Sequence, residues 1–138
     1  MPTGRLLAAL LTMTASASFA APPNYLAVDH SSPTLIEAKS AQALWKSALP
    51  DKLVKLYPVA KWGFLTQVEG GFDDGMVCVV TARAMLLPRQ GKVLVFQPAK
   101  TTTTFGSQAG ATQEQCRALA KAKLGESVEA MRAALLPR

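Results

Sequence analysis

Residues 75–100 read GMVCVVTARAMLLPRQGKVLVFQPAK, and the first half of this stretch decides the fold. From Met76 to Leu87 the side chains alternate between two faces, as they do in a β-strand. One face is wholly apolar and consists of Met76, Cys78, Val80, Ala82, Ala84 and Leu86. The other face is mixed and consists of Val77, Val79, Thr81, Arg83, Met85 and Leu87. This pattern predicts a central strand that turns its apolar face to the core.

Two further strands are predicted beside the central one. Residues 61–69, KWGFLTQVE, alternate in the same way, and GGFDDG at 70–75 has the residues of a chain reversal. After PRQGK a third strand is expected from Lys92 to Gln97, which KTTTTF at 100–105 could continue. Because proline cannot donate a hydrogen bond to a ladder, Pro98 indicates that this strand lies at a sheet edge. The three strands are expected to form an antiparallel meander.

An N-terminal helix is predicted before the meander. It begins after Ser32, because Pro33 at the first helical position gives up an amide that has no partner there. Thr34 and Glu37 have the spacing of a capping box, and Pro50 ends the helix. Its buried stripe is expected to include Trp45.

A second, longer helix is predicted at the C-terminus. TQEQ at 112–115 is a capping box, and the helix runs from there to near Pro137. Its apolar positions recur at helical spacing: Cys116, Leu119 or Ala120, Lys123 or Leu124, Val128, Met131 and Leu135. Residues 51–58, DKLVKLYP, are expected to add one short helical turn. The predicted fold class is α+β: an N-terminal helix, a three-stranded meander and a long C-terminal helix packed on the sheet.

The two cysteines are predicted to form one disulfide. Cys78 lies on the apolar face of the central strand and Cys116 on the apolar face of the last helix, and these faces should pack together. An even pair of cysteines in an exported chain is typical of a structural bridge. A redox-active pair is disfavoured, because such pairs usually sit close together as Cys-x-x-Cys in an exposed setting.

The N-terminus predicts export. Residues 1–20 have one Arg, an apolar block and a small-residue end, which is the pattern of a signal peptide cleaved after Ala20. A membrane anchor would need about 20 apolar residues, more than this segment offers. We therefore expect the periplasm or full secretion, no transmembrane segment in the mature chain, a flexible leader at 21–32, and a single small domain at 33–138.

The sequence offers few candidates for catalytic or metal-binding side chains. His30 is the only histidine and falls in the predicted leader, so neither a catalytic base nor a four-ligand metal site is expected. No cofactor motif is present. Glu69, Asp73 and Asp74 surround the first reversal and are the carboxylates of an alternative hydrolase hypothesis.

The net positive charge of the chain indicates the general class of its partners. The chain carries 15 Lys+Arg and 9 Asp+Glu, and removal of Arg5 with the signal peptide leaves a net charge of +5 (14 − 9). A basic surface favours a protein or an acidic envelope component as partner. Nucleic acid is disfavoured for an exported chain.

The functional hypothesis is an exported, non-enzymatic binding protein of the inhibitor, immunity or envelope accessory type. Its expected partner-binding residues lie on the mixed sheet face and basic rim: Arg83, Thr81, Val79, Met85 and Lys100. That face is exposed only if both helices cover the Cys78 side, and one helix on each face is equally compatible with the sequence. The alternatives are the hydrolase and a structural assembly subunit that pairs through an edge strand around Thr101–Thr104. A homodimer is compatible with each.

Overall fold

The computed structural model describes residues 24–137, so the predicted signal peptide and its cleavage site after Ala20 lie outside the described residues. The elements follow in the order β1 (Ala27–Asp29), α1 (Ala38–Ala48), α2 (Asp51–Leu56), β2 (Trp62–Phe72), β3 (Val77–Gln90), β4 (Val93–Leu94), β5 (Lys100–Ala109) and α3 (Gln113–Leu135). The mixed α+β class is confirmed.

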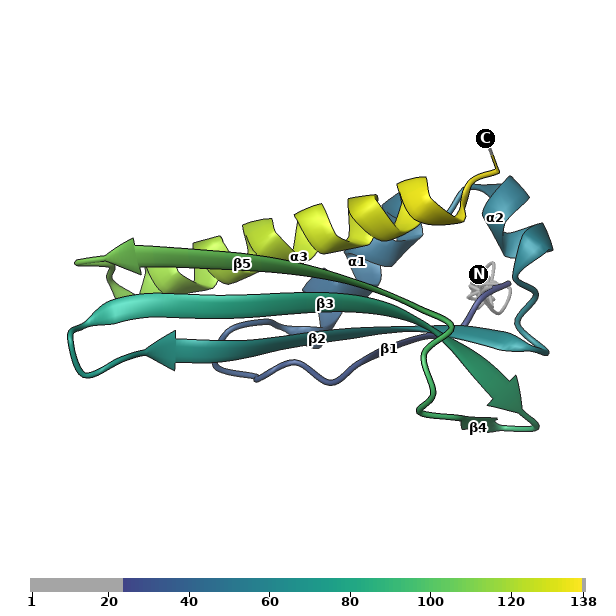
Figure 1. Ribbon diagram of the computed structural model, residues 1–138, viewed down its shortest axis with the longest axis horizontal. Coiled ribbons are helices and arrows are strands. Elements are labelled where there is room, and N and C mark those ends of the chain that lie inside the picture. Colours follow the sequence, from purple (N-terminus) through teal and green to yellow (C-terminus); the bar gives the residue numbers. More distant parts are fainter. Residues whose placement is uncertain (1–23, 138) are drawn as a thin grey trace, which may run out of the picture.

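The sheet has β3 at its centre (Figure 1). β2 pairs with β3 in antiparallel register from Trp62–Pro88 to Phe72–Cys78, and β5 pairs with the other side of β3. β1 adds a parallel strand beside β2, and β4 pairs only with the end of β3. The predicted central strand is confirmed from Val77 onward, but Met76, which was expected on the core face, lies before β3 and is 66% exposed. The sheet has five strands rather than three.

The third strand lies later in the chain than predicted. The strand expected at Lys92–Gln97 is reduced to the two residues of β4, and KTTTTF begins the ten-residue β5 instead. Leu94 explains this difference, because it packs against Leu65, Met85 and Leu87 on the sheet face. The chain gains more by covering these apolar side chains than by extending the ladder.

The predicted flexible leader contributes a strand. Ala27–Asp29 pairs with Phe64–Thr66, and the backbone amide of His30 donates to the Thr66 carbonyl oxygen at 2.9 Å. The Asp29 carboxylate accepts hydrogen bonds from the hydroxyl groups of Ser31, at 2.6 Å, and of the fully buried Thr66, at 2.8 Å. The Thr66 hydroxyl also lies 3.5 Å from the Val28 carbonyl oxygen, and because both acceptors belong to β1, satisfying this buried hydroxyl holds the segment against β2.

The N-terminal helix begins later than predicted. α1 starts at Ala38 with Glu37 as its N-cap residue, and the Thr34–Glu37 capping box does not form. Leu35 and Ile36 are both buried, and their backbone amides both donate to the Ser32 carbonyl oxygen at 3.0 Å, which forms a turn ahead of the helix. The chain therefore enters the core through a turn. The helical turn predicted from Asp51 is confirmed as α2.

Both helices pack on the Cys78 side of the sheet (Figure 1). Trp45 of α1 meets Phe64 of β2 with 4.9 Å between ring centroids. The capping box at Thr112 is present, and the buried stripe of α3 is Cys116, Ala120, Leu124, Ser127, Val128, Met131 and Leu135. The opposite side of the sheet, called here the outer face, carries neither α1 nor α3.

Threonines of β5 also fix α3. The Thr102 hydroxyl donates to the Ser127 carbonyl oxygen at 2.7 Å, and the Thr104 hydroxyl donates to the Lys123 carbonyl oxygen at 2.6 Å. Gly106 lies against Leu119 and Lys123, where an added Cβ would come within 3.0 Å of both side chains. Alternate positions of the Thr-rich strand thus hold the long helix close to the sheet.

Replacing Thr104 with valine is expected to lower the free energy of unfolding by about 1 kcal/mol, because the hydrogen bond to α3 is lost. Thr103→Val is the matched control, since Thr103 is exposed and such surface changes usually stay within about 0.5 kcal/mol. Urea denaturation of both variants measures the difference. Equal losses would show that the Thr104 bond adds nothing.

Candidate functional site

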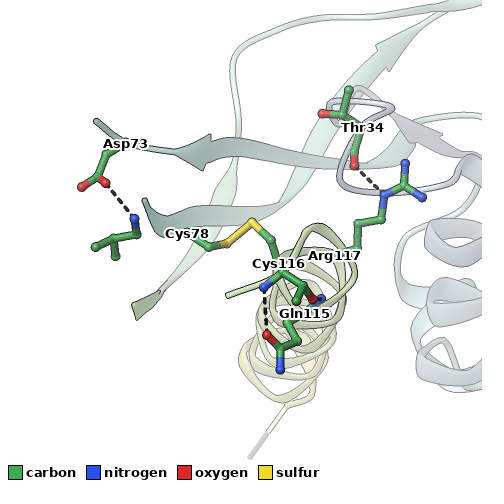
Figure 2. The surroundings of a disulfide bond; sticks show 8 residues. Thr34, Asp73, Cys78, Gln115, Cys116 and Arg117 are labelled. Atoms are coloured by element: carbon green, nitrogen blue, oxygen red, sulfur yellow. Dashed lines mark hydrogen bonds between the residues drawn. A yellow bond between two sulfur atoms is a disulfide. The ribbon is translucent and has the colours of Figure 1, made fainter. Parts of the chain in front are cut away.

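The disulfide joins the sheet to α3 as predicted (Figure 2). Cys78 and Cys116 lie with their Cα atoms 5.6 Å apart, and both residues are fully buried. A thiolate from outside cannot reach a buried bridge, so the position is that of a structural rather than a redox-active pair. The residue after Cys116 connects α3 to the segment before α1: the Arg117 side chain donates through Nε to the Thr34 carbonyl oxygen at 2.9 Å.

The outer face is divided into two parts. Near β4, Leu94 and the chain around it cover Leu65, Met85 and Leu87, which form a second, smaller core. Met85 is only 3% exposed, so this predicted partner-binding residue is not available to a partner. The part of the predicted binding face that a partner could reach therefore ends before Met85.

The uncovered part of the outer face lies around Val79, Thr81 and Arg83. In the ladder Thr81 stands opposite Glu69 of β2 and Phe105 of β5, so these side chains share one face. Val79 is 44% exposed and Phe105 is 71% exposed. A shallow hollow of about 410 Å³ beside them is lined by residues 69–73 together with Val79, Thr81 and Arg83.

Three of the five predicted binding residues thus lie together, and two do not. Lys100 pairs with Leu86, whose side chain belongs to the core face, so Lys100 lies in a row that points away from Arg83. Phe105 was not predicted as part of this face, although it shares the parity of the exposed Thr101 and Thr103. The alternation of side chains along this segment could have placed Phe105 on the same face as Thr101 and Thr103. That inference needed the strand to be recognised from Lys100 onward.

The carboxylates at the hollow are engaged in local structure. Asp73 accepts a hydrogen bond from the Val77 backbone amide at 2.8 Å through its Oδ1 atom, which closes the reversal between β2 and β3. Glu69 accepts from the Gln67 side-chain amide at 2.6 Å. These two acids share the hollow with Arg83, so the predicted basic rim does not gather at this place.

No group of three metal-ligating side chains is found among residues 24–137. Over the same described range, no helix has the length and apolarity needed to cross a membrane.

Comparisons with known proteins give only distant likenesses. No family model and no curated protein matches the chain. Among solved structures, the PelC dodecamer of Paraburkholderia phytofirmans is similar with 12% identity and a TM-score of 0.40, covering 79% of this chain and 87% of that one. A candidate lipoprotein of Caulobacter crescentus CB15 is similar with 11% identity and a TM-score of 0.36, covering 79% and 86%. These likenesses are too distant to assign a family or a function.

Proposed function

We propose that this chain is an exported, non-enzymatic binding protein, and that a partner protein docks on the uncovered part of the outer face, around Val79, Thr81 and Arg83. The observation that carries the proposal is the division of that face. On one half Leu94 covers Leu65, Met85 and Leu87, whereas the other half leaves Val79 and Phe105 open on a sheet that a disulfide and two helices support from behind. An exposed apolar patch with a polar rim commonly marks an interaction site.

The geometry favours binding over hydrolysis. A hydrolase of the carboxylate type needs two acids that converge on an enclosed substrate. Here the hollow is shallow, Asp73 caps a turn, and Asp74 is not among the residues that line the hollow. Because Glu69 and Asp73 offset Arg83, the partner is expected to present a mixed surface, with apolar groups for Val79 and Phe105, rather than a strongly acidic one.

The compartment is part of the same proposal. The signal-peptide pattern of residues 1–20 supports export, and the buried Cys78–Cys116 bridge is of the kind that persists in oxidising compartments. An accessory role in the cell envelope or in the secreted fraction is consistent with both observations.

Photo-crosslinking in the host cell tests the proposal. A photoreactive amino acid in place of Val79 is expected to give one discrete adduct with a mass different from twice that of the chain. The same amino acid in place of Ala118, which is exposed on α3, is the control and should give none. Equal adducts from both positions, no adduct from residue 79, or only an adduct of two copies would refute docking of another protein on this face.

The substitution Arg83→Glu should separate binding from folding. Arg83 is half-buried and joins neither ion pair of the described residues, so the free energy of unfolding should change by no more than about 0.5 kcal/mol. The adduct from residue 79 should fall about tenfold, because the charge beside the hollow is reversed. Lys39→Glu on the exposed side of α1 makes the same charge change as a control. Severe unfolding of the Arg83 variant would show that this face is buried.

A further inference from the structure

The β5 edge of the sheet is long and open. β5 pairs with β3 on one side, and within residues 24–137 no strand pairs with its other side. The opposite edge of the sheet is β1, which is only three residues long. Natural proteins commonly shorten or shield their edge strands. The ten residues of β5 therefore call for an explanation.

The hydrogen bonds of β2 show which β5 groups point outward. The Phe64 amide donates to the Leu26 carbonyl oxygen, and the Thr66 carbonyl accepts from the His30 amide, so even-numbered residues of β2 face β1. Successive residues of a strand point in opposite directions, so odd-numbered residues of β2 bond to β3. By the observed registers, odd residues of β3 then face β2 and even ones face β5.

It follows that the even-numbered residues of β5 bond to β3. The odd-numbered residues direct both their N–H and their C=O groups away from the sheet: Thr101, Thr103, Phe105, Ser107 and Ala109. The side chains of all five are exposed. None of the residues from 101 to 109 is charged or is proline, so the usual protections of an edge are missing.

We propose that β5 pairs with β5 of a second copy of this chain, antiparallel, about a two-fold axis at Phe105. This register places Thr101 opposite Ala109 and Thr103 opposite Ser107, and Phe105 meets its own copy. Every outward N–H and C=O group then has a partner, five donors from each copy. No like charges meet between the two paired strands, because Lys100 falls beside Gly110. On the helix side Lys123 lies over Gly106 near the axis, and its charge is paired with Glu126 of the same helix. The two Phe105 rings form a cross-strand aromatic pair on the outer face.

The position of α3 fits this pairing. α3 contacts both β3 and β5 and runs along them (Figure 1), so it lies above the space between these two strands. Its two copies would then be separated by about two strand spacings, roughly 9–10 Å. That is also the interaxial distance of packed helices, about 8–10 Å, so the helices meet without separating the strands.

Proline at the edge provides the first test, made by sedimentation of the purified, unreduced chain between about 1 and 100 µM. The wild-type chain should form a dimer, and Thr103→Pro should raise its dissociation constant at least 100-fold. Proline removes an outward N–H at residue 103 and no bond to β3, so the variant should remain folded. Thr103→Val keeps the amide and should still form the dimer. A monomeric wild-type chain, or a dimer unaffected by proline, overturns the proposal.

Cysteine pairing tests the register even if the proline variant misfolds. In Phe105→Cys the two new thiols would face each other in a hydrogen-bonded pair, with Cα atoms about 5.5 Å apart, which a disulfide can span. In Ser107→Cys they would lie roughly 14 Å apart along the strands and should not join. Mild oxidation should therefore link the first variant and not the second. Equal linkage, or none in the first variant, overturns this register.

This inference is independent of the proposed function. Sedimentation of the pure chain contains no other protein, whereas the crosslinking experiment at residue 79 counts only adducts with another protein. Either proposal can therefore fail while the other stands.

Discussion

The variant Cys116→Ser is expected to lose about 3–4 kcal/mol of unfolding free energy relative to the oxidised wild-type chain. The bridge closes a loop of 38 residues, and in the chain-entropy account most of its effect comes from restricting the unfolded chain. The position adds a second cost, because the serine hydroxyl would replace a sulfur atom in a fully buried site between β3 and α3. The melting temperature should fall by roughly 10–15 °C for a domain of this size.

Calorimetry in oxidising buffer measures this loss, with two controls. The double variant Cys78→Ala/Cys116→Ala removes the bridge without leaving a free thiol or a buried hydroxyl, but it also removes the volume of two buried sulfur atoms. Reduced wild-type protein keeps both sulfur atoms, so it isolates the contribution of the crosslink. Reduced wild-type protein should melt near the double variant. If the single variant melts at the wild-type temperature, the bridge does not contribute to stability in solution.

The parts of the fold that were predictable from sequence have long and regular patterns. The alternation from Met76 to Leu87 indicates β3, and the capping box at Thr112 indicates the start of α3. Once both apolar faces are known, the pairing of Cys78 with Cys116 follows. In each case a local pattern and the tertiary packing require the same structure.

The parts that were not predictable depend on contacts between distant residues. Residues 27–29 have no strand signal of their own and become a strand because residues 64–66 of β2 offer them partners. Likewise, Lys92–Gln97 resembles a strand, but Leu94 is used to cover Leu65 and Leu87. The apolar content of both segments was visible, whereas the surface that each one covers was not.

The candidate binding face shows the same division. Alternation placed Val79, Thr81 and Arg83 on one face correctly, because a strand fixes the relative direction of its own side chains. It could not show that Met85, on the same face, lies beneath Leu94. Nor could it bring Phe105 opposite Thr81, because that depends on the register between β3 and β5.

Gly70→Ala is expected to be the other large loss, about 3 kcal/mol or more, since strain at a positive φ adds to a backbone collision. Gly70 has φ +129° and stands opposite Val80 in the ladder. A Cβ at this position would overlap the carbonyl oxygen of Val79. Backbone atoms cannot move aside as a side-chain tip can, so β2 must shift away from β3 at the edge of the hollow.

The neighbouring glycine offers a matched control for that collision. Gly71 also has a positive φ, +143°, but an added Cβ there meets no atom within 4 Å. Gly71→Ala should therefore cost only the backbone strain, about 1–2 kcal/mol. Urea denaturation of the two variants isolates the collision as their difference. Similar losses would mean that β2 and β3 do not approach so closely at Gly70, and the hollow beside Val79 and Arg83 would then have a different shape in solution.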